Sequence, residues 1–436
     1  MQLNVCILSF PRRYVISNSH MALAHCLIFL VLLQSSRSGE LGPYFKACQS
    51  NSSLLFQTNE GIDPIYSGNS TIELRKTCEN VDKACTCDSP QLMRCHNPNT
   101  GNLSNIIRAI SSSPTLDIKM LDLNLPNIQI FTKKYFRRPN QKSKNSLKLV
   151  GLFVSSNGTL NTLEDGSFLG LRQDLQVLGL SDNHLGPELP QEIFSLPNLV
   201  RLDISKNRIS SLRPILKHST RSLNYLDLSG NDLERINNFN SSIFPDSLCT
   251  LRLSHNQITL DGLLKANLAQ IGYLDLSNNK ISGNLTKYIF DGRGGKQVEY
   301  LYLDSNYLSY IGENSFCGLP MLKYLRLSHN SIDQLDKNSF KCLKHLTYID
   351  LSYNQILDIT RGLFDPISDS LTNLILSNNH LSVLYSPITT VPLARLTYLD
   401  LQNNEIIKIG GNTFEFLNSL TTLLLAGWLN HYEISR

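Results

Sequence analysis

One nine-residue pattern recurs along this chain and restricts the folds it can adopt. The pattern is L-x-x-L-x-L-x-x-N, with an aliphatic residue at positions 1, 4 and 6 and Asn at position 9. Its starts are spaced about 25 residues apart, a period typical of proteins built from stacked repeat units. Eleven full units begin at Leu149, Leu175, Leu199, Leu223, Leu248, Ile271, Val298, Leu322, Leu346, Leu371 and Leu396, a weaker one at Ile118, and a defective one at Leu420.

The alternation inside each unit predicts a short strand. Side chains at positions 1, 4 and 6 then point into a core, and those at positions 3, 5 and 7 point outward. Successive strands would stack into a parallel sheet, about 4.8 Å apart, because each unit covers the apolar edge of its neighbour.

The Asn at position 9 lies where the chain turns off the strand. Its amide both donates and accepts, so it can satisfy backbone groups that the turn leaves unpaired. We therefore predict a buried ladder of Asn157, Asn183, Asn207, Asn231, Asn256, Asn279, Asn306, Asn330, Asn354, Asn379 and Asn404.

Phenylalanines recur near the end of most units, four to eight residues before the next unit begins. We expect them to stack along the side opposite the sheet. They are Phe168, Phe194, Phe244, Phe290, Phe316, Phe340, Phe364 and Phe414.

The units resemble the typical extracellular leucine-rich-repeat family, whose members include chaoptin, Slit and the Toll-type ectodomains. The late F-x-x-L of that family stands here as Phe316-Cys317-Gly318-Leu319. The resemblance covers about residues 78–425. It implies an α/β horseshoe solenoid with a parallel sheet on the concave face and irregular or 3₁₀ segments on the convex side.

Four cysteines form the cluster C-x6-C-x-C-x7-C at Cys78, Cys85, Cys87 and Cys95. The first unit has no neighbour before it, so its apolar edge needs a lid, and a short lid needs cross-links. The cluster looks like the family's N-terminal cap, and the resemblance implies the pairs Cys78–Cys87 and Cys85–Cys95. Sequence alone allows three connectivities, and a zinc site is the alternative.

The remaining cysteines are less constrained. Cys317 and Cys342 occupy equivalent positions in adjacent units, within disulfide reach. Either a bridge or two separate buried thiols fits this spacing. Cys48 and Cys249 have no evident partner, and Cys249, at position 2 of its unit, is a candidate free thiol on the rim of the sheet.

The N-terminal segment predicts secretion. An apolar run from Ala22 to Leu33 follows Arg12 and Arg13, as in a signal peptide, and is too short for a membrane span. Met21 is an alternative start, and a cytosolic protein with a buried N-terminal helix is the alternative interpretation. We divide the chain into a signal peptide (1–38), a polar leader (39–77), the cysteine-rich cap (78–117), about 12–13 repeat units (118–425) and a non-repeat tail (426–436).

Secretion would expose N-x-S/T sequons to glycosylation. We predict modification at Asn51, Asn69, Asn102, Asn240 and Asn284. Asn157 also begins a sequon, but as a ladder residue we expect it to be buried and unmodified.

Catalytic patterns do not emerge from the sequence. Asp203 and Asp227 share position 5 of adjacent units and form a carboxylate pair suited to acid–base work, yet Asp is common in L-D-L strands. We therefore predict no enzyme activity, no cofactor and no metal. The net charge of +4 is too small to indicate a nucleic-acid partner.

Positions 3 and 5 are rich in Tyr and Arg, the residues enriched in interface hot spots, and they face the usual binding surface of a solenoid. The alternative is that the tyrosines stack on one another and stabilise the sheet. The predicted partner-binding residues are Tyr225, Arg252, Tyr273, Tyr300, Tyr302, Tyr324, Arg326, Tyr348, Asp350 and Tyr398.

These features predict a secreted or cell-surface recognition or adhesion protein with an extracellular protein ligand. The alternative is a non-catalytic subunit or carrier that stabilises another secreted protein. A basic stretch predicts a site for heparan sulphate or an acidic membrane surface or, alternatively, a solvated loop. It comprises Lys133, Lys134, Arg137, Arg138, Lys142, Lys144 and Lys148.

The end of the chain departs from the family. Trp428 stands where the ladder Asn belongs, and no cysteine follows Cys342. We expect either a truncated product or an edge covered by a partner or a second copy, with homo-association through Leu423 and Leu425.

Overall fold

The computed structural model describes 81–89, 91–99, 101, 103–112, 117–136, 147–212, 220–236, 243–263, 268–286, 289–290, 295–384, 387–425 and the backbone of 433–434. Several predictions made from the sequence lie outside these residues. They concern the signal peptide and leader, Cys48, Cys78, Asn51, Asn69, Asn102, Asn240, the basic residues from Arg137 to Lys144, and Trp428.

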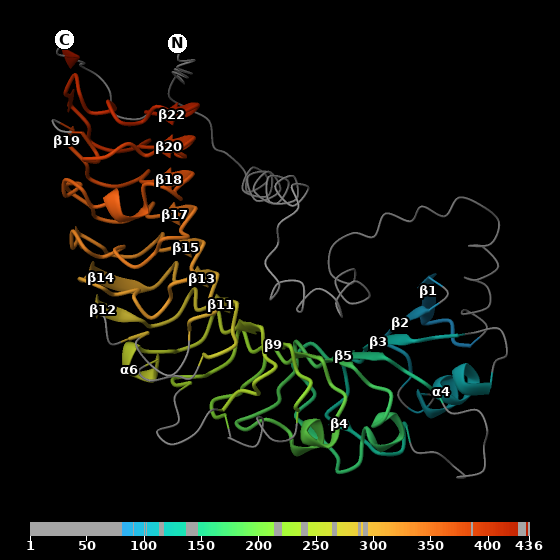
Figure 1. The fold of residues 1–436 in the computed structure, drawn as a ribbon. Coiled ribbons are helices and arrows are strands. Elements are labelled where there is room, and N and C mark those ends of the chain that lie inside the picture. The colour runs from blue at the N-terminus through green and yellow to red at the C-terminus, as the bar shows by residue number, and fades with distance from the viewer. Residues whose placement is uncertain are drawn as a thin grey trace, which may run out of the picture. The chain divides into compact units, whose positions relative to one another are not determined.

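A 15-stranded sheet runs through the described units (Figure 1). The weak unit, the eleven full units and the defective unit each contribute one strand, as the alternation predicts. These strands are β3 (Met120–Asn124), β5 (Gly151–Ser155), β7 (Val177–Gly179), β8 (Arg201–Asp203), β9 (Tyr225–Asp227), β10 (Thr250–Arg252), β11 (Tyr273–Asp275), β13 (Tyr300–Tyr302), β15 (Tyr324–Arg326), β17 (Tyr348–Asp350), β18 (Asn373–Ile375), β20 (Tyr398–Asp400) and β22 (Thr422–Leu424).

These thirteen strands are parallel and in register. Tyr273 pairs with Tyr300 and Leu274 with Leu301, so equivalent positions of neighbouring units lie side by side. The leucines behind the sheet are buried, and Leu325 and Leu327 are both 0% exposed, but Leu423 and Leu425 of the last unit are only partly buried. The predicted parallel solenoid with an apolar core is confirmed.

A hairpin and a helix cover the N-terminal end of the core. Strands β1 (Cys85–Ser89) and β2 (Leu92–His96) pair antiparallel, and β2 then pairs in parallel with β3. Helix α4 (Leu103–Ser112) buries Leu103, Ile106, Ile107 and Ile110, the i, i+3, i+4, i+7 stripe of an amphipathic helix. These elements supply the lid that the first unit needs.

Disulfides stabilise this cap. Cys85 and Cys95 lie opposite each other in the hairpin and are joined by a 2.07 Å S–S bond, the pair that the resemblance implies. Cys87 is also disulfide-bonded. Its expected partner, Cys78, lies outside the described residues, so that pairing stays a prediction.

Short elements occupy the side of the solenoid opposite the long sheet (Figure 1). As the resemblance implies, this side is mostly irregular, with 3₁₀ helices at η2 (Leu169–Leu171), η3 (Gln191–Ser195) and η4 (Asp365–Ile367), and a single turn of α-helix, α6 (Leu260–Leu263). It also carries small parallel sheets, which the sequence did not indicate: β4 (Ile130–Phe131) with β6 (Thr162–Leu163); β12 (Ser282–Leu285), β14 (Tyr307–Ile311) and β16 (Gln334–Leu335); and β19 (Val383–Leu384), β21 (Lys408–Ile409) and β23 (Glu433–Ile434).

Phenylalanines stack beneath this convex side. Phe290, Phe316, Phe340 and Phe364 follow one another with ring centroids 6.1–6.2 Å apart. Phe168 instead contacts Phe131, at 5.8 Å. The predicted spine is therefore continuous over four units, and Phe168 has a different partner.

The predicted asparagine ladder joins neighbouring units through backbone hydrogen bonds. Asn256 Nδ2 donates to Leu228 O of the preceding unit (2.9 Å) and to Leu253 O of its own (3.0 Å), while its Oδ1 accepts from Leu233 N (3.0 Å). The same donation to the preceding unit is made by Asn183, Asn207, Asn231, Asn279, Asn306, Asn330, Asn354, Asn379 and Asn404.

Asn157 does not belong to this ladder, and the expectation that it is buried was wrong. It is exposed and left-handed, with φ 53°. In later units the left-handed residue is the one at position 8, such as Asp182 (φ 58°). In the unit of β5 it is Asn157 at position 9, so the turn after β5 begins one residue later. Ser156 is buried instead, and its Oγ accepts from Thr159 N (3.0 Å) and Leu160 N (2.7 Å).

Candidate protein-binding face

The outward side chains of the long sheet, at positions 3, 5 and 7, form what we call the concave face. Register brings Tyr273, Tyr300, Tyr324 and Tyr348 side by side at position 3, across strands β11, β13, β15 and β17. Tyr302 projects from position 5 between them. These five residues are the tyrosine cluster.

The rings of the tyrosine cluster contact one another. Tyr324 and Tyr348 are stacked with centroids 4.2 Å apart and planes 7° from parallel. Tyr302 lies 5.1 Å from Tyr273 and 5.4 Å from Tyr324, and Tyr300 lies 6.0 Å from Tyr324. Such pairs contribute about 0.5–1.5 kcal/mol each beyond area burial, so the cluster stabilises the sheet as well as presenting an aromatic surface.

Exposure divides the cluster into supporting and surface members. Tyr324 is 8% exposed, at the centre of the contacts, whereas Tyr273, Tyr300, Tyr302 and Tyr348 are partly exposed. Burial raises the pKa of Tyr324, and Tyr348 and Tyr302 add to the rise. Tyr324 therefore holds its neighbours in place, and the other four offer the contact surface.

Two arginines at position 5 each lie between two carboxylates. Arg252 Nη1 is 3.6 Å from Asp227 Oδ2, and its Nε is 3.9 Å from Asp275 Oδ2. Arg326 Nε is 3.7 Å from Asp304 Oδ1 and 3.8 Å from Asp350 Oδ2.

The arginines are the exposed members of these ion pairs. The side chains of Arg252 and Arg326 are 43% and 27% exposed, whereas those of their four aspartates are 7–13% exposed. The pairing distances exceed those of good hydrogen bonds. Both Nε atoms are buried and have no hydrogen-bond partner, so the part of each arginine that a ligand can contact is the exposed remainder of its side chain.

The position-5 aspartates have a structural role. Asp275 Oδ1 accepts from the N–H (3.0 Å) and the Oγ (2.7 Å) of Ser277, and Asp350 contacts Ser352 in the same way. Asp350 thus supports Arg326 rather than presenting its own carboxylate.

The carboxylates considered for acid–base chemistry follow this pattern. Asp203 accepts from Ser205, and Asp227 from Ser229. Burial raises the pKa of Asp203, and the charge of Asp227 adds to the rise. Each carboxylate holds the turn of its own unit.

Two predicted tyrosines lie apart from the cluster. Tyr225 Oη donates to Asp227 Oδ2 (3.2 Å) and lies under the Arg201 guanidinium, 4.0 Å from the ring centroid. Tyr398 is on β20, separated from Tyr348 by β18, whose position 3 is Asn373. Burial, followed by the charge of Asp400, raises the pKa of Tyr398 to about 12.

Sequence reasoning missed two charged residues on this face. Arg201 occupies position 3 immediately before Tyr225, and Asp304 occupies position 7 where neighbouring units have Ser. Both residues depart from the consensus of the repeat unit, and this departure could have identified them in the sequence.

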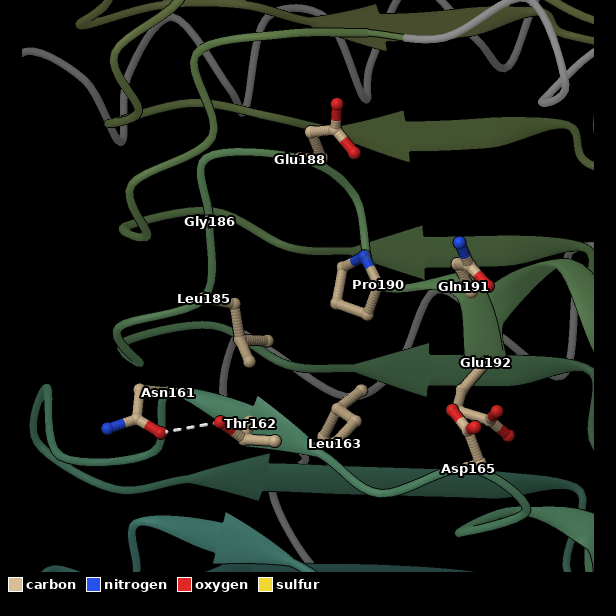
Figure 2. A pocket seen from close by; sticks show the side chains of 10 residues that line it. All are labelled: Asn161, Thr162, Leu163, Asp165, Leu185, Gly186, Glu188, Pro190, Gln191 and Glu192. Carbon is tan, nitrogen blue, oxygen red and sulfur yellow. Dashed lines mark hydrogen bonds between the residues drawn. The ribbon is translucent and has the colours of Figure 1, made fainter.

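A cavity of about 250 Å³ lies elsewhere, between the segments that follow β5 and β7 (Figure 2). Asp165, Glu188 and Glu192 line it together with neutral residues. Burial raises the pKa of Glu192. The cavity contains no His, Cys or Lys, and the described part of the chain has no group of three or more His, Cys, Asp or Glu placed to hold a metal ion.

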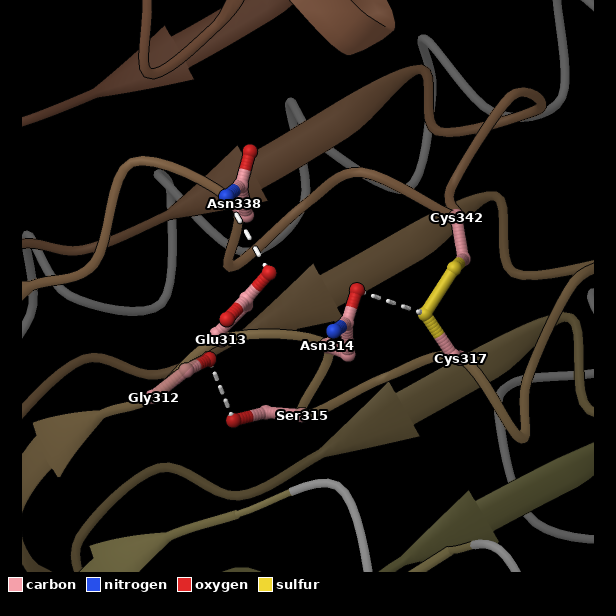
Figure 3. Close-up of a disulfide and its surroundings, with 7 residues drawn as sticks. All are labelled: Gly312, Glu313, Asn314, Ser315, Cys317, Asn338 and Cys342. Atoms are coloured by element: carbon pink, nitrogen blue, oxygen red, sulfur yellow. Dashed lines mark hydrogen bonds between the residues drawn. A yellow bond between two sulfur atoms is a disulfide. The ribbon is translucent and has the colours of Figure 1, made fainter.

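The later cysteines are paired. Cys317 and Cys342 form a disulfide between adjacent units, beside Asn314 on the convex side (Figure 3). Cys249 is also disulfide-bonded, so the interpretation of a free thiol on the rim was wrong. Strand position alone does not show which distant segment reaches a cysteine.

The basic stretch is only partly described. Lys133 Nζ lies 3.3 Å from Glu164 Oε1, and its backbone N–H donates to the same carboxylate (3.0 Å). This lysine is therefore already paired. Heparan sulphate binding stays a prediction.

None of the helices in the described ranges is long and apolar enough to cross a membrane.

Family models described as "Leucine rich repeat" match residues 173–233, 293–368 and 369–431, and a second such model matches 247–265. Similar curated proteins include the disease resistance protein RFL1 of Arabidopsis thaliana, 32% identical over 166 residues. Receptor like protein 23 of the same plant is 30% identical over 162 residues. The human leucine-rich repeats and immunoglobulin-like domains protein 1 is 34% identical over 125 residues.

The matches cover 38%, 33% and 28% of this chain, but only 18%, 18% and 11% of those relatives. The chain thus spans less than a fifth of each.

Solved structures share the fold at low sequence identity. The Drosophila Toll–Spatzle complex matches with a TM-score of 0.53 at 18% identity, covering 81% of this chain and 60% of that one. The LRIM1/APL1C complex matches with a TM-score of 0.51 at 22% identity, covering 72% and 53%. With its repeat motif, its parallel solenoid and these matches, the chain belongs to the leucine-rich-repeat family.

Proposed function

We propose that this protein is a secreted or cell-surface recognition protein that binds a protein ligand through its concave face, without catalysing a reaction. The observation that carries the proposal is the tyrosine cluster with Arg252 at its edge and Arg326 within it. Relatives named as receptor-like proteins support a recognition role, and the apolar run before Leu33 supports secretion.

The chemistry of the face suits a protein partner. Tyrosines offer large, rigid, amphipathic contact area, and here their rings are already held by neighbouring rings, so little side-chain freedom is lost on binding. Guanidinium groups add planar, directional donors. Both residue types concentrate binding energy at interfaces.

The size of the face points the same way. Eight strands from β9 to β20 carry the predicted contacts, which spans roughly 34 Å at 4.8 Å per strand. A surface of that length accommodates a protein interface of standard size, about 800 Å² per partner. A small molecule would need an enclosed pocket, and the described cavity lies after β5 and β7, outside the cluster.

The test is a screen of the secreted full-length chain against an array of Fc-fused extracellular domains. Each binder is then measured with Tyr348→Ala on the concave face and with Tyr307→Ala on β14, which is 62% exposed on the convex side. We expect Tyr348→Ala to weaken binding at least about tenfold and Tyr307→Ala to leave it unchanged. A partner that binds Tyr348→Ala as tightly as the wild type but does not bind Tyr307→Ala would place the site on the convex side. Retention of the chain inside the cell would contradict secretion.

A further inference from the structure

We propose that Asn157 carries an N-linked glycan at the C-terminal end of β5, beside the concave face. This inference rests on the secretion that the proposed function includes. The sequon is Asn157-Gly158-Thr159, and Asn157 is exposed in the folded chain.

The hydrogen bonds around this turn explain why a sugar fits here. A ladder asparagine such as Asn256 uses Nδ2 to donate to three carbonyls, so a substituent on that nitrogen would break bonds between two buried units. Asn157 takes no part in the ladder, because Ser156 Oγ accepts from the local N–H groups in its place. Modification at Asn157 therefore sacrifices no packing.

The backbone presents the amide outward. Asn157 and Gly158 both have positive φ, 53° and 77°, a conformation that Asn and Gly adopt readily. Thr159 is anchored below, with its Oγ1 donating to Ile128 O (2.8 Å). The turn is therefore held in place through Thr159, while the Asn157 side chain is exposed to solvent.

The reaction is a standard group transfer. Asn157 Nδ2 forms a bond to the anomeric carbon of a lipid-linked oligosaccharide diphosphate, the carbon–oxygen bond to the diphosphate breaks, and the amide proton is released as the lipid diphosphate leaves. A second described sequon, Asn284, lies exposed on the convex strand β12. It provides a matched control on the opposite side.

A glycan at Asn157 would limit where a partner can dock. Strand β5 is three strands from β9 in the sheet, roughly 14 Å. A branched sugar at that place covers the N-terminal part of the concave face and leaves the strands from β11 to β17 open. The ligand is thereby directed to the tyrosine cluster.

The experiment is glycopeptide mapping of the full-length chain secreted from cultured animal cells, with enzymatic removal of N-glycans in ¹⁸O-labelled water. We expect the Asn157 peptide to return as ¹⁸O-labelled Asp. Deamidation of Asn157 before the digest incorporates ordinary oxygen, and a parallel incubation in ¹⁸O-labelled water without the enzyme measures deamidation during the digest. Asn157→Gln should remove one glycan with no change in melting temperature, and Thr159→Ser should retain it.

A bare Asn157 peptide from protein that is glycosylated at Asn284 would overturn this inference and leave the proposed secretion standing. Protein with no glycan at either sequon and none in the medium would overturn both.

Discussion

Asn183 Oδ1 is buried without a hydrogen-bond partner, although its counterpart one unit later, Asn207 Oδ1, accepts from Leu185 N at 2.9 Å. The donor equivalent to Leu185 N is Leu160 N, which donates to Ser156 Oγ (2.7 Å) instead. Because the turn after β5 differs from the others, the Asn183 side chain donates hydrogen bonds through Nδ2 but accepts none through Oδ1.

We predict a graded series of ladder substitutions. Asn256→Ala removes bonds to three carbonyls and leaves Leu233 N without an acceptor, and each buried unsatisfied group costs about 1–3 kcal/mol. Asn183→Ala should cost less because it orphans no N–H group. Asn157→Ala should be nearly neutral. Chemical denaturation of the three variants checks the order, and equal losses for Asn256 and Asn157 would contradict the assignment of the ladder.

Core leucines should dominate stability. Leu325→Ala should cost about 2–5 kcal/mol through the cavity it leaves, since Leu325 is 0% exposed. Tyr324→Ala should also destabilise the fold because that ring is buried among three others. Tyr348→Ala should do so less. Melting curves check the ranking, and a Tyr348→Ala variant as unstable as Leu325→Ala would make Tyr348 a structural residue and remove it from the binding site.

Arg252→Lys tests whether Arg252 contributes to binding through its charge or through the geometry of its guanidinium group. Lysine keeps the attraction to Asp227 and Asp275 but loses the planar fork of donors. We expect an unchanged melting temperature and several-fold weaker binding to any partner found with the array. Unchanged affinity would show that Arg252 contributes through its charge alone.

The carboxylate pair at Asp203 and Asp227 predicts a pH effect. The pKa of Asp203 is raised in the fold, first by burial and then by Asp227. The folded protein therefore binds this proton more tightly than the unfolded chain, and its contribution to stability falls as pH rises through the folded-state pKa. Asp203→Asn keeps an acceptor for Ser205 and removes the charge, so the variant should lose less stability between acidic and neutral pH. Parallel melting curves at several pH values would refute this if wild type and variant fell together.

The cap cysteines should be oxidised. Mass mapping without reduction should find Cys85 linked to Cys95 and Cys78 linked to Cys87. Stoichiometric zinc or free thiols at these positions would argue against both the cap and secretion.

Much of the fold follows from the sequence because the constraint is local. Alternation of Leu226 and Leu228 with outward side chains fixes strand and face, and Asn231 fixes the turn. The same pattern wrongly predicted Asn157 as a buried ladder residue. A sequence that fits the consensus does not reveal that the turn is shifted by one residue.

The candidate site was less accessible to this reasoning. Columns of tyrosine are visible in the sequence, but the burial of Tyr324 depends on how three neighbouring rings pack against it. Cys249 needed a partner from a distant segment, which no local pattern specifies.

The asparagine ladder also has a direction that matters while the chain is being made. Leu233 N can donate to Asn256 Oδ1 only once Asn256 of the following unit has been translated and has folded. The same side chain then donates from Nδ2 to Leu228 O. Each unit is therefore completed by the one translated after it, so a growing chain always ends in a unit with unmet backbone groups. The missing residue is translated about 25 residues later, so units can dock one after another from the disulfide-linked cap, which is translated before them.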